Sequence, residues 1–280
     1  MIDPEDLVVM TEDEKLNLIT QLGETEEWRD CFEPIYCRLM DDDSPKVRQA
    51  AVVAMWDLAD PKHIDLLMNK VEGDPDVEVR GKAASVLGIY IYEAVVNESL
   101  EESKYIAVRR FLMDVARDEN EALLVRRMAI EALSFENSED TQDLIAWAYE
   151  HPNKDVKMSA VFAMGRSQNP VWHNAILREL EARDRQLRLE AVNAASEAEL
   201  SAATPVLRNL ATCSDKELRT SALWALAHTR GPGALETIEM CALDKDEDVR
   251  RVAEEAIEEY HSLNRPPPNP SGLENDYDDY

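Results

Sequence analysis

The chain has 280 residues, of which 30 are basic and 58 acidic, and its formal net charge is −28 at pH 7. An acidic surface repels the phosphates of nucleic acids and of anionic lipids, so binding to either is disfavoured. A basic protein partner would be attracted, although the same charge also suits plain solubility or a high-salt environment. The oligomeric state does not follow from these numbers.

The chain's first residues and its cysteines predict a cytoplasmic protein. The first twenty residues carry six acidic side chains and no long apolar run, which does not fit a secretion signal. No stretch approaches the 18 consecutive apolar residues of a membrane span. Four cysteines are too few for a disulfide framework in a chain of this size. Cys31 and Cys37 are six residues apart, so on a helix they point in different directions, and we expect no metal site and no cofactor.

One helical sequence pattern occurs seven times along the chain. Each copy has a basic residue preceded by Val or Leu and followed three positions later by Ala, and these residues are separated by 32, 46, 31, 31, 31 and 31 positions. The basic residues are Arg48, Arg80, Arg126, Lys157, Arg188, Arg219 and Arg250. A fixed period of this size indicates stacked supersecondary units.

Each copy predicts one helix followed by a second. In six copies the residue four before the basic one is Ser, Asp or Asn, which can cap a helix start, and Ala122 is the exception. Apolar residues at −1, +3, +6 and +7 form one buried stripe. The Ala at +3 lets neighbouring helices approach closely. A short polar break such as Asp60-Pro61 then leads to the second helix. The fold class is therefore all-α.

The recurring basic residues allow two interpretations. They could form a row of anion-binding charges. We favour a structural ladder of ion pairs and cap contacts between repeats, because residues that recur once per repeat usually serve stacking.

The pattern Asp-x-x-Val-Arg-x-x-Ala at a spacing of 31 resembles the short HEAT-like repeat named after the phycobilisome lyases. The resemblance implies a right-handed α-solenoid, or superhelix, of about eight HEAT-like helical hairpins over residues 1–263, whose second helices line a concave face. Members of that repeat class include bilin-attaching lyase subunits, a metal-dependent hydroxylase and plain scaffolds. The resemblance is specific for the repeat and not for an activity.

In chain order, residues 1–40 resemble a degenerate N-terminal cap repeat. Thr11 and Glu14 resemble a capping box, and Thr20 stands where the stacking Ala is expected. A second helix is expected from about Glu24 through Trp28 to Tyr36.

Residues 76–118 form an enlarged repeat, because Arg80 and Arg126 are 46 residues apart. If the surplus lengthens two paired helices by about seven residues each, both extend roughly 11 Å beyond the stack. Such an insertion often carries binding, and the alternative is a local accommodation in which Tyr90 and Tyr92 pack on the neighbouring unit.

Aromatic and basic residues of the second helices are the predicted protein-binding residues, since such side chains often anchor interfaces. Trp at helical spacing can equally belong to the core. The candidates are Tyr90, Tyr92, Tyr105, Arg109, Arg110, Trp147, Tyr149, Trp172, Arg178, Arg208 and Asn209.

The last helix, at about 246–262, is expected to be a C-terminal cap, with Glu254 in a slot that is apolar in the other copies. Residues 264–280 are rich in proline and acid and are predicted to be a disordered tail. The tail is either inert or a short linear motif.

Motifs of catalysis are missing from the sequence: it has no Gly-rich phosphate loop, no nucleophile elbow and no His-Glu-x-x-His helix. None of the five histidines is followed by Glu, which argues against the hydroxylase of the resembling class. The sequence therefore predicts a non-enzymatic scaffold that binds a protein on the concave face and the enlarged repeat. The alternative is a bilin lyase-like enzyme or chromophore chaperone subunit.

Overall fold

The computed structural model describes residues 4–24 and 29–264, and every regular element in these ranges is a helix. The predicted all-α class is confirmed. Trp28 and residues 265–280 of the expected tail lie outside the described residues. No helix in the described ranges is long and apolar enough to cross a membrane. The handedness and the number of repeats stay predictions.

The chain divides into two compact units that adjoin in sequence at Trp172 and His173. The predicted single repeat domain over 1–263 stays a prediction. The elements of the first unit are η1 (Pro4–Val9), α1 (Glu12–Gly23), α2 (Arg29–Leu39), α3 (Pro45–Ala54), η3 (Met55–Asp57), η4 (Pro61–His63), α4 (Ile64–Gly73), α5 (Val77–Val86), α6 (Gly88–Val95), α7 (Glu102–Arg117), α8 (Leu123–Leu133), α9 (Glu139–Tyr149), α10 (Lys154–Ser167) and η5 (Pro170–Trp172). Those of the second unit are α11 (His173–Glu179), α12 (Arg185–Glu197), η6 (Ser201–Ala203), α13 (Thr204–Leu210), α14 (Lys216–Thr229), α15 (Ala234–Cys241) and α16 (Glu247–Leu263).

Side-chain oxygens fix where most of the helices that carry the basic residue begin. The N-cap side chain accepts a hydrogen bond from a backbone N–H of the first turn in α5, α10, α12, α14 and α16, at Asp76, Asn153, Asp184, Asp215 and Asp246. The capping box of Thr11 and Glu14 is present in α1. Ser44 precedes α3 but makes no side-chain cap bond, and its hydroxyl donates to Glu12 instead.

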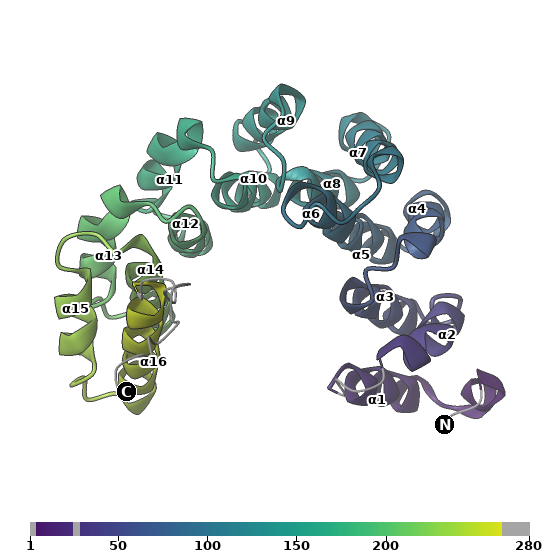
Figure 1. Ribbon diagram of the computed structural model, residues 1–280, viewed down its shortest axis with the longest axis horizontal. Helices are drawn as coiled ribbons and strands as arrows, with labels where there is room; N and C mark the ends of the chain where they lie inside the picture. The colour runs from purple at the N-terminus through teal and green to yellow at the C-terminus, as the bar shows by residue number, and fades with distance from the viewer. Residues whose placement is uncertain (1–3, 25–28, 265–280) are drawn as a thin grey trace, which may run out of the picture. The chain divides into compact units, whose positions relative to one another are not determined.

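The helices of the first unit form two layers (Figure 1). The first helices α1, α3, α5, α8 and α10 contact one another in that order, and α2, α4, α7 and α9 form the other layer. Within this unit the first helices lie on the inner side of the curve (Figure 1). The expectation that second helices line the concave face is therefore wrong for this unit.

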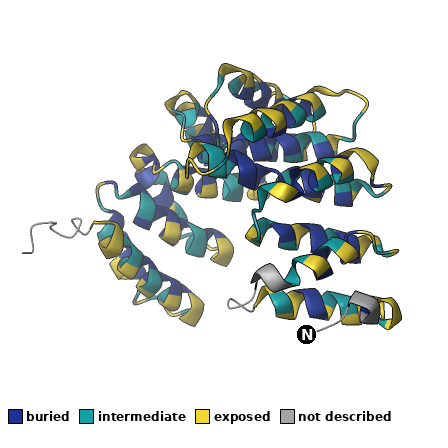
Figure 2. Cartoon of the chain, turned by 45° about the vertical axis from the view of Figure 1, so that its right-hand side comes forward, coloured by how far each residue is buried: buried dark blue, intermediate teal, exposed yellow. Residues whose placement is uncertain are grey.

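The recurring alanines belong to the inner layer. Ala83, Ala129 and Ala160 of the first helices are completely buried. Large buried residues occur in both layers, for example Ile130 and Met164 in the first helices and Leu67 and Ile145 in the second helices. Figure 2 shows that the buried residues run as stripes along the helices rather than covering them.

The second unit repeats this construction. α12, α14 and α16 pack on one another in order, and α13 and α15 pack on α14 and on each other. The recurring alanines Ala191, Ala222 and Ala253 are fully buried, as is Leu226 in α14. At the end of the unit Glu254 is exposed, in the slot where the other copies have an apolar residue.

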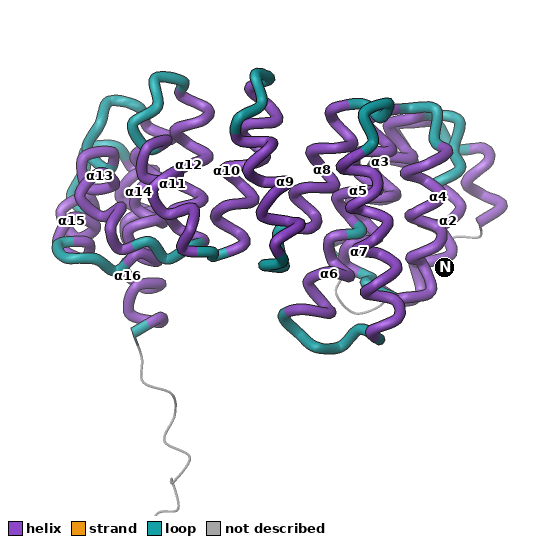
Figure 3. The backbone as a smooth tube through the Cα atoms, turned by 90° about the horizontal axis from the view of Figure 1, so that it is seen from above, coloured by secondary structure: helices purple, strands orange, loops and turns teal. Residues whose placement is uncertain are grey.

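The surplus residues of the enlarged repeat form α6 and a long α7. α6 begins almost directly after α5, and within the first unit its end and the loop that follows it extend beyond the neighbouring helices (Figure 3). α6 packs on α8 through Gly88, where an added Cβ would lie 3.0 Å from the Cα of Ala132. Glycine is favoured here, because any other residue would need the backbone of α8 to move by a few tenths of an ångström.

Candidate partner-binding surface

The basic residue of each repeat is largely engaged in holding helices together. Four of these residues donate an Nη1–H bond to the carbonyl oxygen six positions earlier, over distances of 2.8–3.3 Å. The donor and acceptor pairs are Arg48 and Asp42, Arg80 and Asp74, Arg188 and Ala182, and Arg250 and Asp244. Each guanidinium thus fastens its helix to the chain reversal before it.

Arg48 makes the most complete contact to the next repeat. Its Nε and Nη2 each donate to a carboxylate oxygen of Asp74 at 2.9 Å, and both residues are buried. Burial acts to raise the pKa of Asp74, but the hydrogen bonds from Arg48 and from the backbone N–H of Asp76 outweigh it, and the pKa lies below its ordinary value. This bidentate pair joins α3 to the start of α5.

Other repeats pair the same residue with an acidic residue or place it over an aromatic ring. Arg219 pairs with Asp244 at 3.3 Å, and Asp244, like Asp74, lies six positions before the next basic residue, whereas Arg80 pairs with Glu121 at 2.9 Å. Arg126 instead lies over the ring of Trp147 at 4.6 Å, and Lys157 lies over the ring of Tyr149 at 4.7 Å. These contacts support the structural ladder over a row of charges available to an anion.

Tyr105 and Arg109, both predicted to bind a partner, take part in an internal network around the buried Glu136. The Glu136 carboxylate accepts hydrogen bonds from Tyr105 Oη, Arg109 Nε and the hydroxyls of Ser138 and Thr141. Burial acts to raise the pKa of Glu136, and these hydrogen bonds outweigh it and lower the pKa. Burial, together with Glu136, raises the pKa of Tyr105 to about 12. The network fastens α7 to the start of α9.

Two of the predicted binding residues are buried. Tyr90 is fully enclosed, and its hydroxyl donates to the carbonyl oxygen of Asp60 at 2.9 Å. Tyr149 is 9% exposed, beneath Lys157. For these two the binding prediction is wrong, because the rings fill space between repeats. Tyr92 is half-buried, and its ring packs edge-on against Phe135.

The remaining predicted residues are divided between the two units. Arg110 is exposed on α7, and Trp147 on α9 is partly exposed beneath Arg126. Trp172 is half-buried and donates its indole N–H to Gln142. In the second unit the exposed residues are Arg178, Arg208 and Asn209, and Arg208 donates from Nε to the hydroxyl of Thr237.

The enlarged repeat presents apolar side chains to solvent that the sequence analysis did not single out. Val95 and Val96 at the end of α6 are 41% and 54% exposed, and Ile106 in α7 is 53% exposed. We call these three residues the tip patch. Exposed acidic residues surround them in sequence, at Glu98, Glu101 and Glu102. The sequence could have indicated these residues, because they are β-branched apolar residues in an insertion that repeat stacking does not require.

A second feature is a shallow groove on the inner layer of the first unit. It has a volume of about 480 Å³ and lies across α1 and α3, with Lys82 of α5 at one side. Val53, which is 47% exposed, contributes an apolar surface to it. The groove is open and lacks a catalytic arrangement of side chains among its lining residues.

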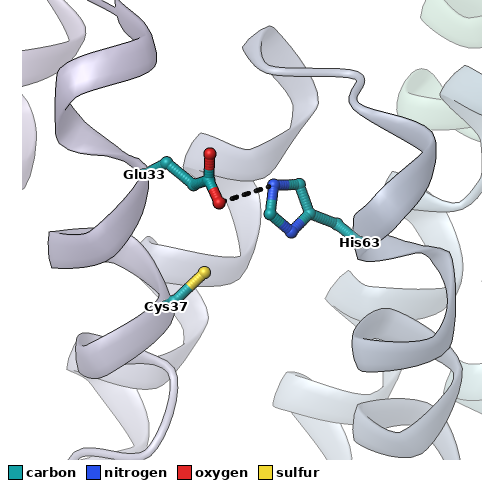
Figure 4. A group of neighbouring side chains, drawn as sticks. All are labelled: Glu33, Cys37 and His63. Carbon is teal, nitrogen blue, oxygen red and sulfur yellow. Dashed lines mark ion pairs between the residues drawn. The ribbon is translucent and has the colours of Figure 1, made fainter.

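One group of side chains in the first unit combines three kinds of potential metal ligand. Glu33 and Cys37 lie one turn apart on α2, and both approach His63 of η4 (Figure 4). One atom from each, a carboxylate oxygen, the thiol sulfur and a ring nitrogen, lies within 4.8 Å of the other two. Sequence reasoning considered only Cys31 with Cys37 and so missed this group, although the spacing of Glu33 and Cys37 places both on one helix face.

The comparisons with known proteins agree with the repeat architecture that the sequence predicts. A family model described as HEAT repeats matches residues 33–103 and 173–258, which together are more than half of the chain. The comparison with curated proteins gives no match.

The search of solved structures gives similar chains. The complex of CpcE and CpcF of phycocyanin lyase from Nostoc sp. PCC7120 is similar over 93% of this chain and 95% of that chain, with 18% identity and a TM-score of 0.56. Human deoxyhypusine hydroxylase in complex with glycerol is similar over 93% of each chain, with 16% identity and a TM-score of 0.40. The predicted resemblance to the lyase type of repeat is confirmed, and identities this low show the fold alone.

Proposed function

The chain belongs to the HEAT-repeat family, and we propose that it is a non-enzymatic scaffold that binds a protein partner through the tip patch of its enlarged repeat. The observation that carries this proposal is the exposure of Val95, Val96 and Ile106 on an extension that repeat stacking does not need. The three residues lie on an insertion in one repeat, and such insertions often carry binding.

The charge around the tip patch defines the kind of partner. Glu98, Glu101 and Glu102 are exposed beside the apolar residues, and the whole chain carries a net charge of −28. A partner segment with apolar side chains flanked by Lys or Arg would bury the valines and isoleucine and meet the carboxylates at the rim. Its association should weaken as salt is added.

The inner groove is the alternative contact surface on the first unit. Val53 is its exposed apolar residue, and Lys46 and Lys82 lie at its sides. Asp57 also lines the groove and Lys46 pairs with Glu12, so the groove has mixed charge and suits a basic segment less well than the tip patch with its acidic surroundings.

Photo-cross-linking tests the proposal. A photoreactive amino acid replaces Asn97, which is exposed beside Val96, and in a control protein it replaces Leu243, which is 85% exposed in the second unit. We expect a protein cross-linked at position 97 through a peptide rich in Lys or Arg, and no such product at position 243.

Three charge variants test the contact. The double variant Val96→Lys, Ile106→Lys should reduce capture of that cross-linked protein by roughly tenfold or more, since each substitution places a charge in an apolar contact. The controls Val53→Lys and Leu243→Lys should leave capture nearly unchanged. Equal capture by the unaltered chain and all three variants would contradict the tip patch, and a reduction with Val53→Lys alone would move the contact to the groove.

The lyase-like alternative rests on fold likeness at 18% identity, and no feature of the described residues favours it. A tetrapyrrole that co-purifies with the chain and is retained by the Val96→Lys, Ile106→Lys protein would support it instead.

A further inference from the structure

We propose that Glu33, Cys37 and His63 form a binding site for a transition-metal ion, with Zn²⁺ the best match. This site is separate from the tip patch and does not depend on the proposed partner binding. It joins two neighbouring repeats, because Glu33 and Cys37 belong to α2 of the N-terminal repeat and His63 to η4 of the next one.

The geometry brings the three ligand atoms almost to coordination distance. They lie within 4.8 Å of one another, and the side chains converge from two elements (Figure 4). In a tetrahedral zinc site with bonds of about 2.0–2.3 Å, neighbouring ligand atoms are about 3.3–3.8 Å apart. Small side-chain rotations of the half-buried Glu33 and Cys37 close this difference without moving α2.

His63 supplies an independent reason to expect a ligand. Its side chain is almost completely buried, with the residue 5% exposed, and its Nε2 has no hydrogen-bond partner. The nearest acidic atom is Glu33 Oε1 at 3.5 Å, which is too long for a normal hydrogen bond. Buried polar atoms in proteins rarely stay unpaired, and a metal ion between Nε2 and the carboxylate would satisfy both.

The surrounding charges leave one carboxylate oxygen for the ion. Lys62 contacts Glu33 through Oε2 and also pairs with Asp60, whereas Oε1 is the oxygen that faces His63. The Lys62 side chain is 53% exposed, so its charge stays hydrated while Oε1 binds the metal. Glu33 would thus be a monodentate ligand.

The donor set selects the class of metal. A thiolate, an imidazole and a carboxylate suit Zn²⁺ and neighbouring transition metals, whereas Mg²⁺ and Ca²⁺ prefer oxygen ligands throughout. Three protein ligands leave a fourth position for water. Metal binding would fasten the N-terminal repeat to the rest of the first unit, and this predicts a metal-dependent stability.

Cobalt substitution tests the site in the full-length chain. The protein is kept reduced, stripped of metal with a chelator and titrated with Co²⁺, which shows a thiolate-to-cobalt charge-transfer absorbance when Cys binds it. We expect one equivalent to bind, Zn²⁺ to displace it, and the thermal midpoint to rise with Zn²⁺. Mutation of residues that only hydrogen-bond to metal ligands changes metal affinity by about 10–100-fold. Loss of a ligand itself should have at least the larger effect, so Cys37→Ser and His63→Ala should each weaken metal binding by roughly 100-fold or more.

Controls distinguish this site from adventitious binding and from misfolding. Cys213→Ser, at a half-buried cysteine of the second unit, should bind Co²⁺ as the unaltered chain does. Glu33→Gln keeps the shape of the side chain and should weaken binding while the circular dichroism in chelator stays unchanged. The proposal is overturned if the unaltered chain gives no charge-transfer absorbance, or if the absorbance survives Cys37→Ser and is lost in Cys213→Ser.

Discussion

The basic residue of the repeat meets different partners in two regions of the first unit. Between α3 and α5, Arg48 is buried and forms a bidentate pair with Asp74. Between α8 and α10, Arg126 and Lys157 lie over the rings of Trp147 and Tyr149 instead. The repeat therefore fixes a cation at one place on the helix, and in these two regions the cation meets a carboxylate in one and an aromatic ring in the other.

The two regions differ in what the loss of the cation would leave behind. Removing Arg48 would leave the Asp74 carboxylate buried with fewer partners, and an unpaired buried charge is costly. Removing Lys157 would leave an aromatic ring, which loses an attraction but carries no charge of its own.

The largest expected effect is that of Arg48→Ala. We expect it to lower the free energy of unfolding by about 3–5 kcal/mol, because it strands the Asp74 carboxylate in a buried position. Chemical denaturation measures the loss. Lys46→Ala is the control, since Lys46 pairs with Glu12 at the exposed surface and should contribute about 0–1 kcal/mol. Similar losses of unfolding free energy for both variants would contradict the conclusion that Arg48 forms a buried, stabilising ion pair with Asp74.

Two variants in the second unit test whether buried apolar side chains contribute more to the free energy of unfolding than the ion pairs of the basic residues do. Leu226→Ala should cost about 2–5 kcal/mol, because Leu226 is fully buried in α14. Arg219→Ala should cost about 1 kcal/mol, since its contacts to Asp244 and Asp246 are longer, at 3.3 and 3.7 Å, than those of Arg48. Equal losses in denaturation would mean that the ion pairs are stronger than their geometry indicates.

Acid should reduce the difference in unfolding free energy between the unaltered chain and Arg48→Ala. The pKa of Asp74 in the folded chain lies below its ordinary value of 3.8, so the pair stabilises the fold above that pH. The contribution is lost as the pH falls through the lower folded-state pKa. Denaturation at neutral pH and in acid should therefore show a smaller penalty for Arg48→Ala in acid. The penalty for Leu226→Ala should stay the same, and a shrinking penalty there would point to a general acid effect.

The smallest effect is expected between α8 and α10. Lys157→Ala should cost about 0.5–1 kcal/mol, the size of a partly exposed cation–π contact. Lys157→Arg keeps a cation over Tyr149 and should cost less. If Lys157→Ala destabilised the chain as much as Arg48→Ala, the distinction between the two regions would fail.

The sequence predicted the parts of the fold that recur. Ala129, Ala160, Ala191 and Ala222 were expected to stack, and all four are fully buried. Recurrence is informative because a residue that returns once per period must occupy the same place in each unit. The helix caps could be predicted for the same reason. Ser44 is the exception, because its hydroxyl donates to Glu12 of α1 instead of capping its own helix.

The parts that occur only once could not be predicted in this way. Tyr90 lies in the surplus of the enlarged repeat, which has no counterpart to show which side is buried. The inner position of the first helices depends on how the two layers pack over several repeats, and the pattern within one repeat does not reveal it. The meeting of Cys37 with His63 depends on how two successive repeats pack, and their spacing of 26 residues carries no signal of its own.

The carbonyl contacts of the basic residues have a consequence for the rate of folding. Arg80, Arg188 and Arg250 each bind an oxygen only six positions away, and the Arg48–Asp74 pair spans only 26. Native contacts that are close in sequence cost little loop entropy and are typical of fast-folding helical proteins. Folding can therefore start in any one hairpin and spread to its neighbours in either direction, without a search between distant segments.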